Sequence, residues 1–91
     1  MDKLTCTGVI VREEGAYSAL CPELDVASAG ATPPEAKAML LEAVALHIEG
    51  AIEDGLPYLR PVPPQADPRT ATPDAVVEVF PFRAEALLRE E

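Results

Sequence analysis

The stretch that decides the fold is residues 17–38, which read YSALCPELDVASAGATPPEAKA. Residues 17–21 are predicted to form a strand that ends at Pro22, because proline has no N–H to donate to a sheet ladder. Residues 25–30 are predicted to form a second short strand. Thr32 follows them as the cap of a helix, since its side chain can accept a hydrogen bond from the first helical turn.

Another strand is predicted before this stretch. Residues 4–12 are rich in β-branched side chains and partly alternate between apolar and polar. A short polar turn at 13–16, which contains glycine, joins them to the strand at 17–21. Residues 4–21 therefore indicate an antiparallel hairpin.

The helix is predicted to run from Thr32 to about Asp54. Pro33 suits the first helical position, where a missing N–H costs nothing. Glu35 completes a capping box with Thr32, and Gly55 is a natural stop.

The apolar surface of this helix is wider than one sheet face can cover. One side of the helix carries Ala36, Leu40, Val44, His47, Ile48 and Ala51, and the opposite side carries Glu35, Glu42, Glu49 and Glu53. The apolar arc is extended on one flank by Leu41 and Ile52 and on the other by Met39 and Leu46. This surplus indicates a second contact, which is either another subunit or partner, or the C-terminal segment folding back.

The rest of the chain completes a single domain, 1–91, with its core in 4–82. The proline-rich segment 55–75 is predicted to be an exposed loop, and 76–82 alternates as a fourth strand. Residues 83–91 favour a short C-terminal helix or a tail. The predicted fold class is α+β, a two-layer β-β-β-α-β arrangement of a small antiparallel sheet and one long helix.

Composition limits the possible functions. The 91 residues carry a net charge of −9, which repels phosphate backbones, so no direct nucleic-acid binding is expected and a basic protein partner is favoured. No apolar run is long enough to cross a membrane, and the two cysteines have neither metal-ligand nor redox spacing. We expect a cytoplasmic protein with free thiols.

The same stretch resembles the signature of the HicB family, the antitoxin half of a bacterial toxin–antitoxin pair. The residues that carry the resemblance are Tyr17, Ala19, Pro22, Leu24, Gly30, Thr32, Glu35 and Ala36. The resemblance covers roughly residues 4–82 and implies a partial ribonuclease-H-like fold of three antiparallel strands, a helix and a further strand. It also implies a partner, a small basic HicA-like ribonuclease toxin whose catalytic histidine the antitoxin covers.

The chain departs from the family pattern in two places. Many family members carry a C-terminal DNA-binding domain, whereas only nine residues follow Phe82 here, so a short form without that domain is expected. Asp25 and Val26 stand where the family commonly has proline and glycine, which changes the turn before the third strand.

No catalytic, cofactor-binding or metal-binding residue is predicted, and the chain is not expected to be an enzyme. Two-metal nuclease chemistry needs converging carboxylates, and the first strand has none inside it. The single histidine, His47, has no second histidine with which to share a metal. Two alternatives stay open: a stand-alone homo-oligomer (dimer or tetramer) and, less favoured, a degenerate metal-dependent nuclease. The candidate partner contacts are Tyr17, Met39, Leu46 and His47.

Overall fold

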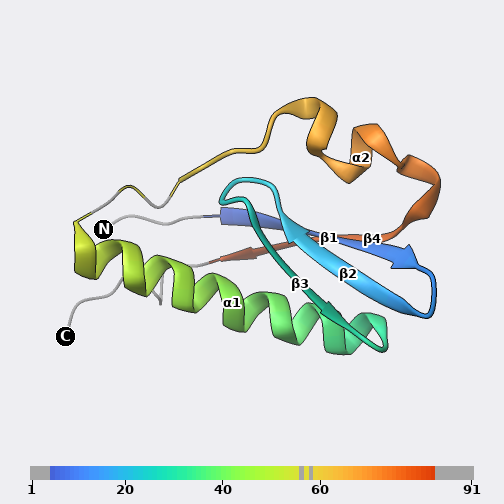
Figure 1. Ribbon diagram of the computed structural model, residues 1–91, viewed down its shortest axis with the longest axis horizontal. Coiled ribbons are helices and arrows are strands. Elements are labelled where there is room, and N and C mark those ends of the chain that lie inside the picture. The colour runs from blue at the N-terminus through green and yellow to red at the C-terminus, as the bar shows by residue number, and fades with distance from the viewer. Residues whose placement is uncertain (1–4, 56, 58, 84–91) are drawn as a thin grey trace.

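The computed structural model describes residues 5–55, 57 and 59–83, and it shows one antiparallel sheet with a long helix across one face (Figure 1). The strand order in the sheet is β3-β2-β1-β4. The elements are β1 (Thr5–Glu13), β2 (Ala16–Cys21), β3 (Val26–Gly30), α1 (Pro33–Asp54) and β4 (Val76–Arg83). The predicted fold class, β-β-β-α-β, is therefore confirmed.

The hairpin of β1 and β2 is tighter than the sequence predicts. Its register pairs Val9 with Leu20 and Glu13 with Ala16, so both strands continue up to a two-residue turn. Gly15 occupies that turn with a φ of 76°, a conformation that glycine adopts without the steric cost a side chain would add.

The third strand begins at Val26, so its predicted start at Asp25 is wrong. Asp25, predicted to begin the third strand, has a φ of 56° and donates its backbone N–H to the Cys21 carbonyl at 2.9 Å. A short polar side chain tolerates this left-handed conformation better than most residues. The strand therefore begins one residue later, at Val26, which pairs with Cys21.

Thr32 and Gly55 cap the two ends of α1, as predicted, and only the partner of the Glu35 carboxylate differs. Thr32 Oγ1 accepts from the Glu35 N–H at 3.2 Å, and Gly55 closes the helix with a φ of 69°. The Glu35 carboxylate reaches one residue further back than a capping box requires and accepts from the Ala31 N–H at 3.0 Å. The helix start is thus held by reciprocal hydrogen bonds across the β3–α1 junction.

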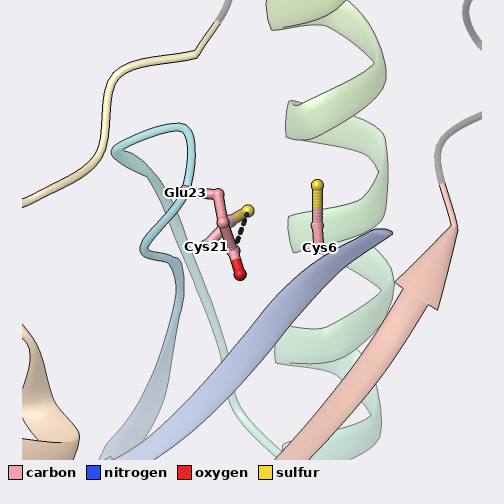
Figure 2. Close-up of side chains that lie close together, drawn as sticks. All are labelled: Cys6, Cys21 and Glu23. Carbon is pink, nitrogen blue, oxygen red and sulfur yellow. Dashed lines mark hydrogen bonds between the residues drawn. The ribbon is translucent and has the colours of Figure 1, made fainter. Parts of the chain in front are cut away.

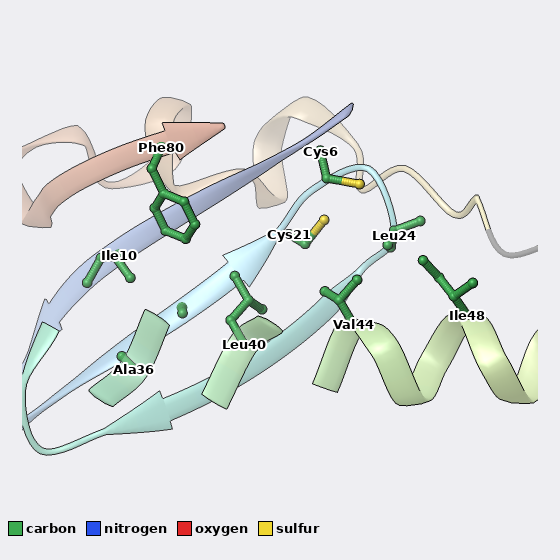
Figure 3. Close-up of a cluster of buried hydrophobic side chains, with 10 residues drawn as sticks. Cys6, Ile10, Cys21, Leu24, Ala36, Leu40, Val44, Ile48 and Phe80 are labelled. Atoms are coloured by element: carbon green, nitrogen blue, oxygen red, sulfur yellow. The ribbon is translucent and has the colours of Figure 1, made fainter. Parts of the chain in front are cut away.

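The core lies between α1 and one face of the sheet (Figure 3). Four helix residues are fully buried, Ala36, Leu40, Val44 and Ile48, at the spacing of one helical stripe. The sheet and its turn contribute Cys6, Ile10, Ala19, Cys21, Leu24 and Phe80.

The opposite face of the sheet is also covered in part. Val9 and Val11, which alternate with Ile10 along β1 and so point away from α1, are buried. The proline-rich segment crosses this side of the sheet, where α2 (Pro68–Ala71) contacts β1 (Figure 1).

The prediction that the proline-rich segment is simply a loop is wrong for its second half. It contains three short helical turns: η1 (Pro64–Ala66), α2 and η2 (Pro73–Ala75). Each begins with a proline, whose fixed φ is already that of a first helical turn. The Asp67 side chain accepts from the Arg69 N–H at 2.9 Å and caps α2.

The last strand pairs antiparallel with β1 and places Phe80 opposite Gly8. A Cβ at Gly8 would overlap the Phe80 ring, so the missing side chain is what leaves room for the ring against β1. The strand continues through Arg83, one residue beyond its predicted end, so the C-terminal helix or tail predicted for 83–91 does not include Arg83. The rest of that prediction, 84–91, lies outside the described residues. None of the helices described has the combination of length and apolar character that crossing a lipid bilayer requires.

Candidate functional site

The outer surface of α1 carries exposed apolar side chains on one flank. Met39 and Leu46, two of the predicted partner contacts, are two turns apart on the same side of the helix. Leu46 is 63% exposed and Met39 is 40% exposed, although both belong to a helix that buries its other side. Met39 and Leu46 form the first apolar flank of α1.

A second apolar flank lies on the side of α1 that faces β4. It consists of Leu41 and Ile52, both exposed. The orientation follows from Lys37, whose ammonium forms a 3.2 Å ion pair with Glu78 of β4 and lies 4.5 Å from the centre of the Phe80 ring. Because the pair is partly exposed, it contributes little to stability, but it fixes which side of the helix looks toward β4.

An acidic ridge separates the two flanks. Its members all lie on the side of α1 turned away from the sheet, and all are exposed: Glu35, Glu42, Glu49 and Glu53. The outer surface of α1 therefore combines negative charge with exposed apolar side chains on either side of it.

The other two predicted partner contacts are less accessible. Tyr17 lies on β2, partly buried, and packs against the core. His47 is partly buried on α1, at the margin of its buried stripe. The structure therefore brings Met39 and Leu46 together on one surface, and it gives Tyr17 a packing role.

Half of the residues that resemble the HicB signature lie at the junction between β3 and α1: Gly30, Thr32, Glu35 and Ala36. A Cβ at Gly30 would lie 2.5 Å from the Ala36 N atom and 2.9 Å from the Glu35 carbonyl carbon. Only a residue without a side chain allows the first turn of α1 to approach β3 so closely. Ala36 is itself fully buried at this contact.

A second candidate site lies inside the domain, where two cysteines meet a carboxylate (Figure 2). Cys6 on β1 and Cys21 at the end of β2 are both free thiols with no exposed surface. Their Sγ atoms and a carboxylate oxygen of Glu23 all lie within 4.8 Å of one another. The Cys21 thiol donates a hydrogen bond to Glu23 Oε1 at 3.5 Å.

Glu23 is held in place by β1. The Thr7 N–H donates to Oε1 at 2.9 Å, and the Thr7 hydroxyl donates to Oε2 at 2.8 Å. Burial favours the neutral acid, but these hydrogen bonds outweigh it and lower the pKa of Glu23. The Glu23 carboxylate thus accepts the Thr7 N–H in place of a backbone carbonyl of a neighbouring strand, at the point where β2 has ended.

The thiols are protonated at neutral pH. The pKa of Cys21 is raised to about 12, mainly by burial and in addition by Cys6 and by the negative charge of Glu23. Burial also raises the pKa of Cys6. Neither thiol is therefore activated as a nucleophile, because the reactive species is the thiolate.

This cluster could not be predicted from the sequence. Cys6 and Cys21 fall within the predicted strands 4–12 and 17–21, but no sequence pattern singles out Glu23. The grouping depends on strand register: β1 and β2 pair Val9 with Leu20, which brings Cys6 level with the turn after Cys21. The signal available in the sequence was only that two cysteines stand in consecutive strands of one hairpin.

Comparison of the chain with protein-family models, with curated proteins and with solved structures finds no significant match in any of the three.

Proposed function

We propose that this chain is a protein-binding domain of the HicB antitoxin type, which neutralises a small basic HicA-like ribonuclease by covering its catalytic histidine. The observation that carries the proposal is the outer surface of α1, where the acidic ridge runs between two exposed apolar flanks. In this function the chain acts by occlusion and contributes no catalytic group.

Charge and apolar contact have separate roles in such a complex. The net charge of −9 speeds the approach of a basic partner and disfavours wrong partners, more than it adds affinity. Affinity comes from apolar burial: covering the exposed part of Leu46 contributes about 1–2 kcal/mol.

The potential ligand groups do not resemble a hydrolytic centre. In the part of the chain that the structure describes, the one cluster of such groups is that of Cys6, Cys21 and Glu23. Two-metal hydrolysis relies on hard cations held by several carboxylates, a different donor set. The proposal accordingly assigns the chain a binding role. Its free thiols suit a reducing cytoplasm, which is where such an inhibitor would act.

A second candidate function is a homo-oligomeric domain without a toxin, as a dimer or a tetramer. It is favoured by β4, which is an edge strand among the described residues and exposes Val77 and Val79. Exposed apolar side chains on an edge strand are a common basis for pairing between copies.

The test uses a purified HicA-like ribonuclease from a gene adjacent to that of this chain. Its cleavage of RNA is measured at increasing concentrations of the chain. We expect cleavage to stop near a one-to-one ratio. The substitution Leu46→Arg should weaken inhibition by about tenfold or more, because it removes apolar contact and places a positive charge against a basic surface. The matched control is Leu59→Arg, a similar change at an exposed leucine of the proline-rich segment, which should inhibit within about twofold of the unmodified chain.

Two outcomes would contradict the proposal. Cleavage that is unaffected by a stoichiometric excess of the folded chain excludes the inhibitor role. Equal loss of inhibition in both variants would place the contact elsewhere than on α1. Sedimentation velocity separates the second candidate: a stable oligomer that Val79→Arg turns into a monomer, without any ribonuclease binding, supports self-assembly instead.

A further inference from the structure

The buried cluster of Cys6, Cys21 and Glu23 has the composition of a metal site. We propose that these three residues bind one Zn²⁺ ion, which would tie β1 to the turn between β2 and β3. The site offers two sulfur donors and one carboxylate oxygen, and it leaves a fourth position for water.

The distances suit tetrahedral coordination. Bonds of about 2.3 Å to sulfur and 2.0 Å to oxygen place a sulfur and an oxygen donor about 3.5 Å apart and two sulfur donors about 3.8 Å apart. Cys21 Sγ and Glu23 Oε1 are 3.5 Å apart. All three donor atoms lie within 4.8 Å of one another, so closing the site around an ion shortens any donor–donor distance by no more than roughly 1.3 Å.

The carboxylate is oriented as a ligand carboxylate usually is, by hydrogen bonds from outside the site. Thr7 donates to both oxygens of Glu23, through its N–H at 2.9 Å and its hydroxyl at 2.8 Å. The turn that carries Glu23 is fixed in addition by the proline-rich segment, because the Arg60 N–H donates to the Glu23 carbonyl at 3.0 Å and the Val62 N–H donates to the Pro22 carbonyl at 2.9 Å. The donors therefore stand on backbone that is held from two sides.

The surroundings favour a borderline-soft divalent ion. Both thiol groups are fully covered, whereas Glu23 is partly exposed and gives the ion a route from solvent. Zn²⁺ displaces the proton of each thiol, and both protons are released to solvent as the metal–sulfur bonds form. The two resulting thiolates exclude Mg²⁺ and Ca²⁺, which take oxygen donors. Two thiolates and one carboxylate leave a net charge of −1 around a divalent ion and −2 around a monovalent one, so a buried site prefers the divalent ion.

The experiment uses the whole chain, reduced and treated with a chelator, and titrates it first with Co²⁺ and then with Zn²⁺. We expect one Co²⁺ per chain, a thiolate-to-cobalt charge-transfer band and the intense visible bands of a tetrahedral centre, all of which Zn²⁺ removes. With free Zn²⁺ at about a hundred times the dissociation constant, the midpoint of thermal unfolding should rise by about 10 °C or more. These readings need no variant and do not depend on any toxin.

Three variants assign the ligands. Cys6→Ser and Cys21→Ser should each weaken Zn²⁺ binding about a hundredfold or more, and Glu23→Gln should weaken it about tenfold to a hundredfold while its amide oxygen still accepts from Thr7. His47→Gln is the control, because it removes the one histidine of the chain, and it should bind within about twofold of the unmodified protein. If a cysteine variant does not fold, the Co²⁺ spectrum of the unmodified chain still shows whether thiolates bind the metal, and the Glu23→Gln titration still shows whether Glu23 does.

A folded, reduced chain that binds neither ion at micromolar concentration would overturn the proposal and leave the cluster as hydrogen-bonded thiols. So would a Co²⁺ complex without a thiolate band, or Zn²⁺ binding that His47→Gln abolishes and Glu23→Gln leaves intact.

Discussion

The close approach of α1 to β3 makes Gly30→Ala the sharpest test of the fold. The added Cβ would lie 2.5 Å from Ala36 N, 2.9 Å from the Glu35 carbonyl carbon and 3.0 Å from Ala36 Cα. All three are backbone atoms of the first helical turn, so no side chain can rotate away. The turn itself must retreat by roughly 1 Å to reach ordinary contact distances, which loosens the packing of Ala36.

The expected cost follows from two opposing terms. Overpacking of this kind typically costs about 1–3 kcal/mol. Replacing glycine by alanine also reduces the freedom of the unfolded chain, which returns about 0.4–1 kcal/mol. The net loss in the free energy of unfolding should be about 1–2 kcal/mol, and for a domain of this size the unfolding midpoint should fall by about 4–16 °C.

The assay is thermal and urea unfolding followed by circular dichroism, with Gly50→Ala as the matched control. That substitution adds the same methyl group inside α1, where nothing lies within 4 Å of the new Cβ. It should raise the free energy of unfolding by about 1 kcal/mol, because alanine is the better helix former. The same chemical change is therefore expected to have opposite signs at the two positions. A Gly30→Ala protein as stable as the unmodified chain would refute the close helix–strand contact.

Three further measurements test the core, the proline-rich segment and the thiols. Leu40→Ala removes a fully buried side chain of α1 and should lower the free energy of unfolding by about 2–5 kcal/mol in urea titrations; a loss below 1 kcal/mol would show that Leu40 is not in the core. Hydrogen bonds from Arg69 lower the pKa of Asp67, so their contribution is present above about pH 4 and is lost as the pH falls through the folded-state pKa. Asp67→Asn should therefore be less stable than the unmodified chain at pH 7, with the gap narrowing in acid; a gap that stays constant down to pH 3 would contradict this pairing. Cys6 and Cys21 are buried and protonated, so iodoacetamide should label both only after unfolding, and rapid labelling of the native chain, read by mass spectrometry, would show that the cluster is open.

The elements that could be predicted from the sequence are those whose signals come from neighbouring residues. Thr32 and Gly55 mark the ends of α1 because a helix cap is satisfied within one turn. The fourth strand was predicted from alternation alone, since its side chains take turns between two faces. The helical turns at η1, α2 and η2 were missed because each is very short, and a proline that begins a turn is also typical of a loop.

For the candidate site on α1 too, some features can be predicted from neighbouring residues and others depend on tertiary contacts. The acidic ridge and the two apolar flanks of α1 were readable from helical spacing, because residues three and four apart share a side of any helix. Helical spacing does not show which flank faces β4, because that depends on the contacts of Lys37 with Glu78 and Phe80 of that strand.

Sequence alone therefore determined the order of the elements, the ends of the helix and the distribution of charge around it, because each depends on contacts within a few residues. Tertiary structure decided that Gly8 lies under Phe80, that Gly30 lies against Ala36, and that two buried thiols meet a carboxylate. Those contacts depend on the register between strands and on the docking of the helix. Register and docking are set by packing of the whole core, which no short segment encodes by itself.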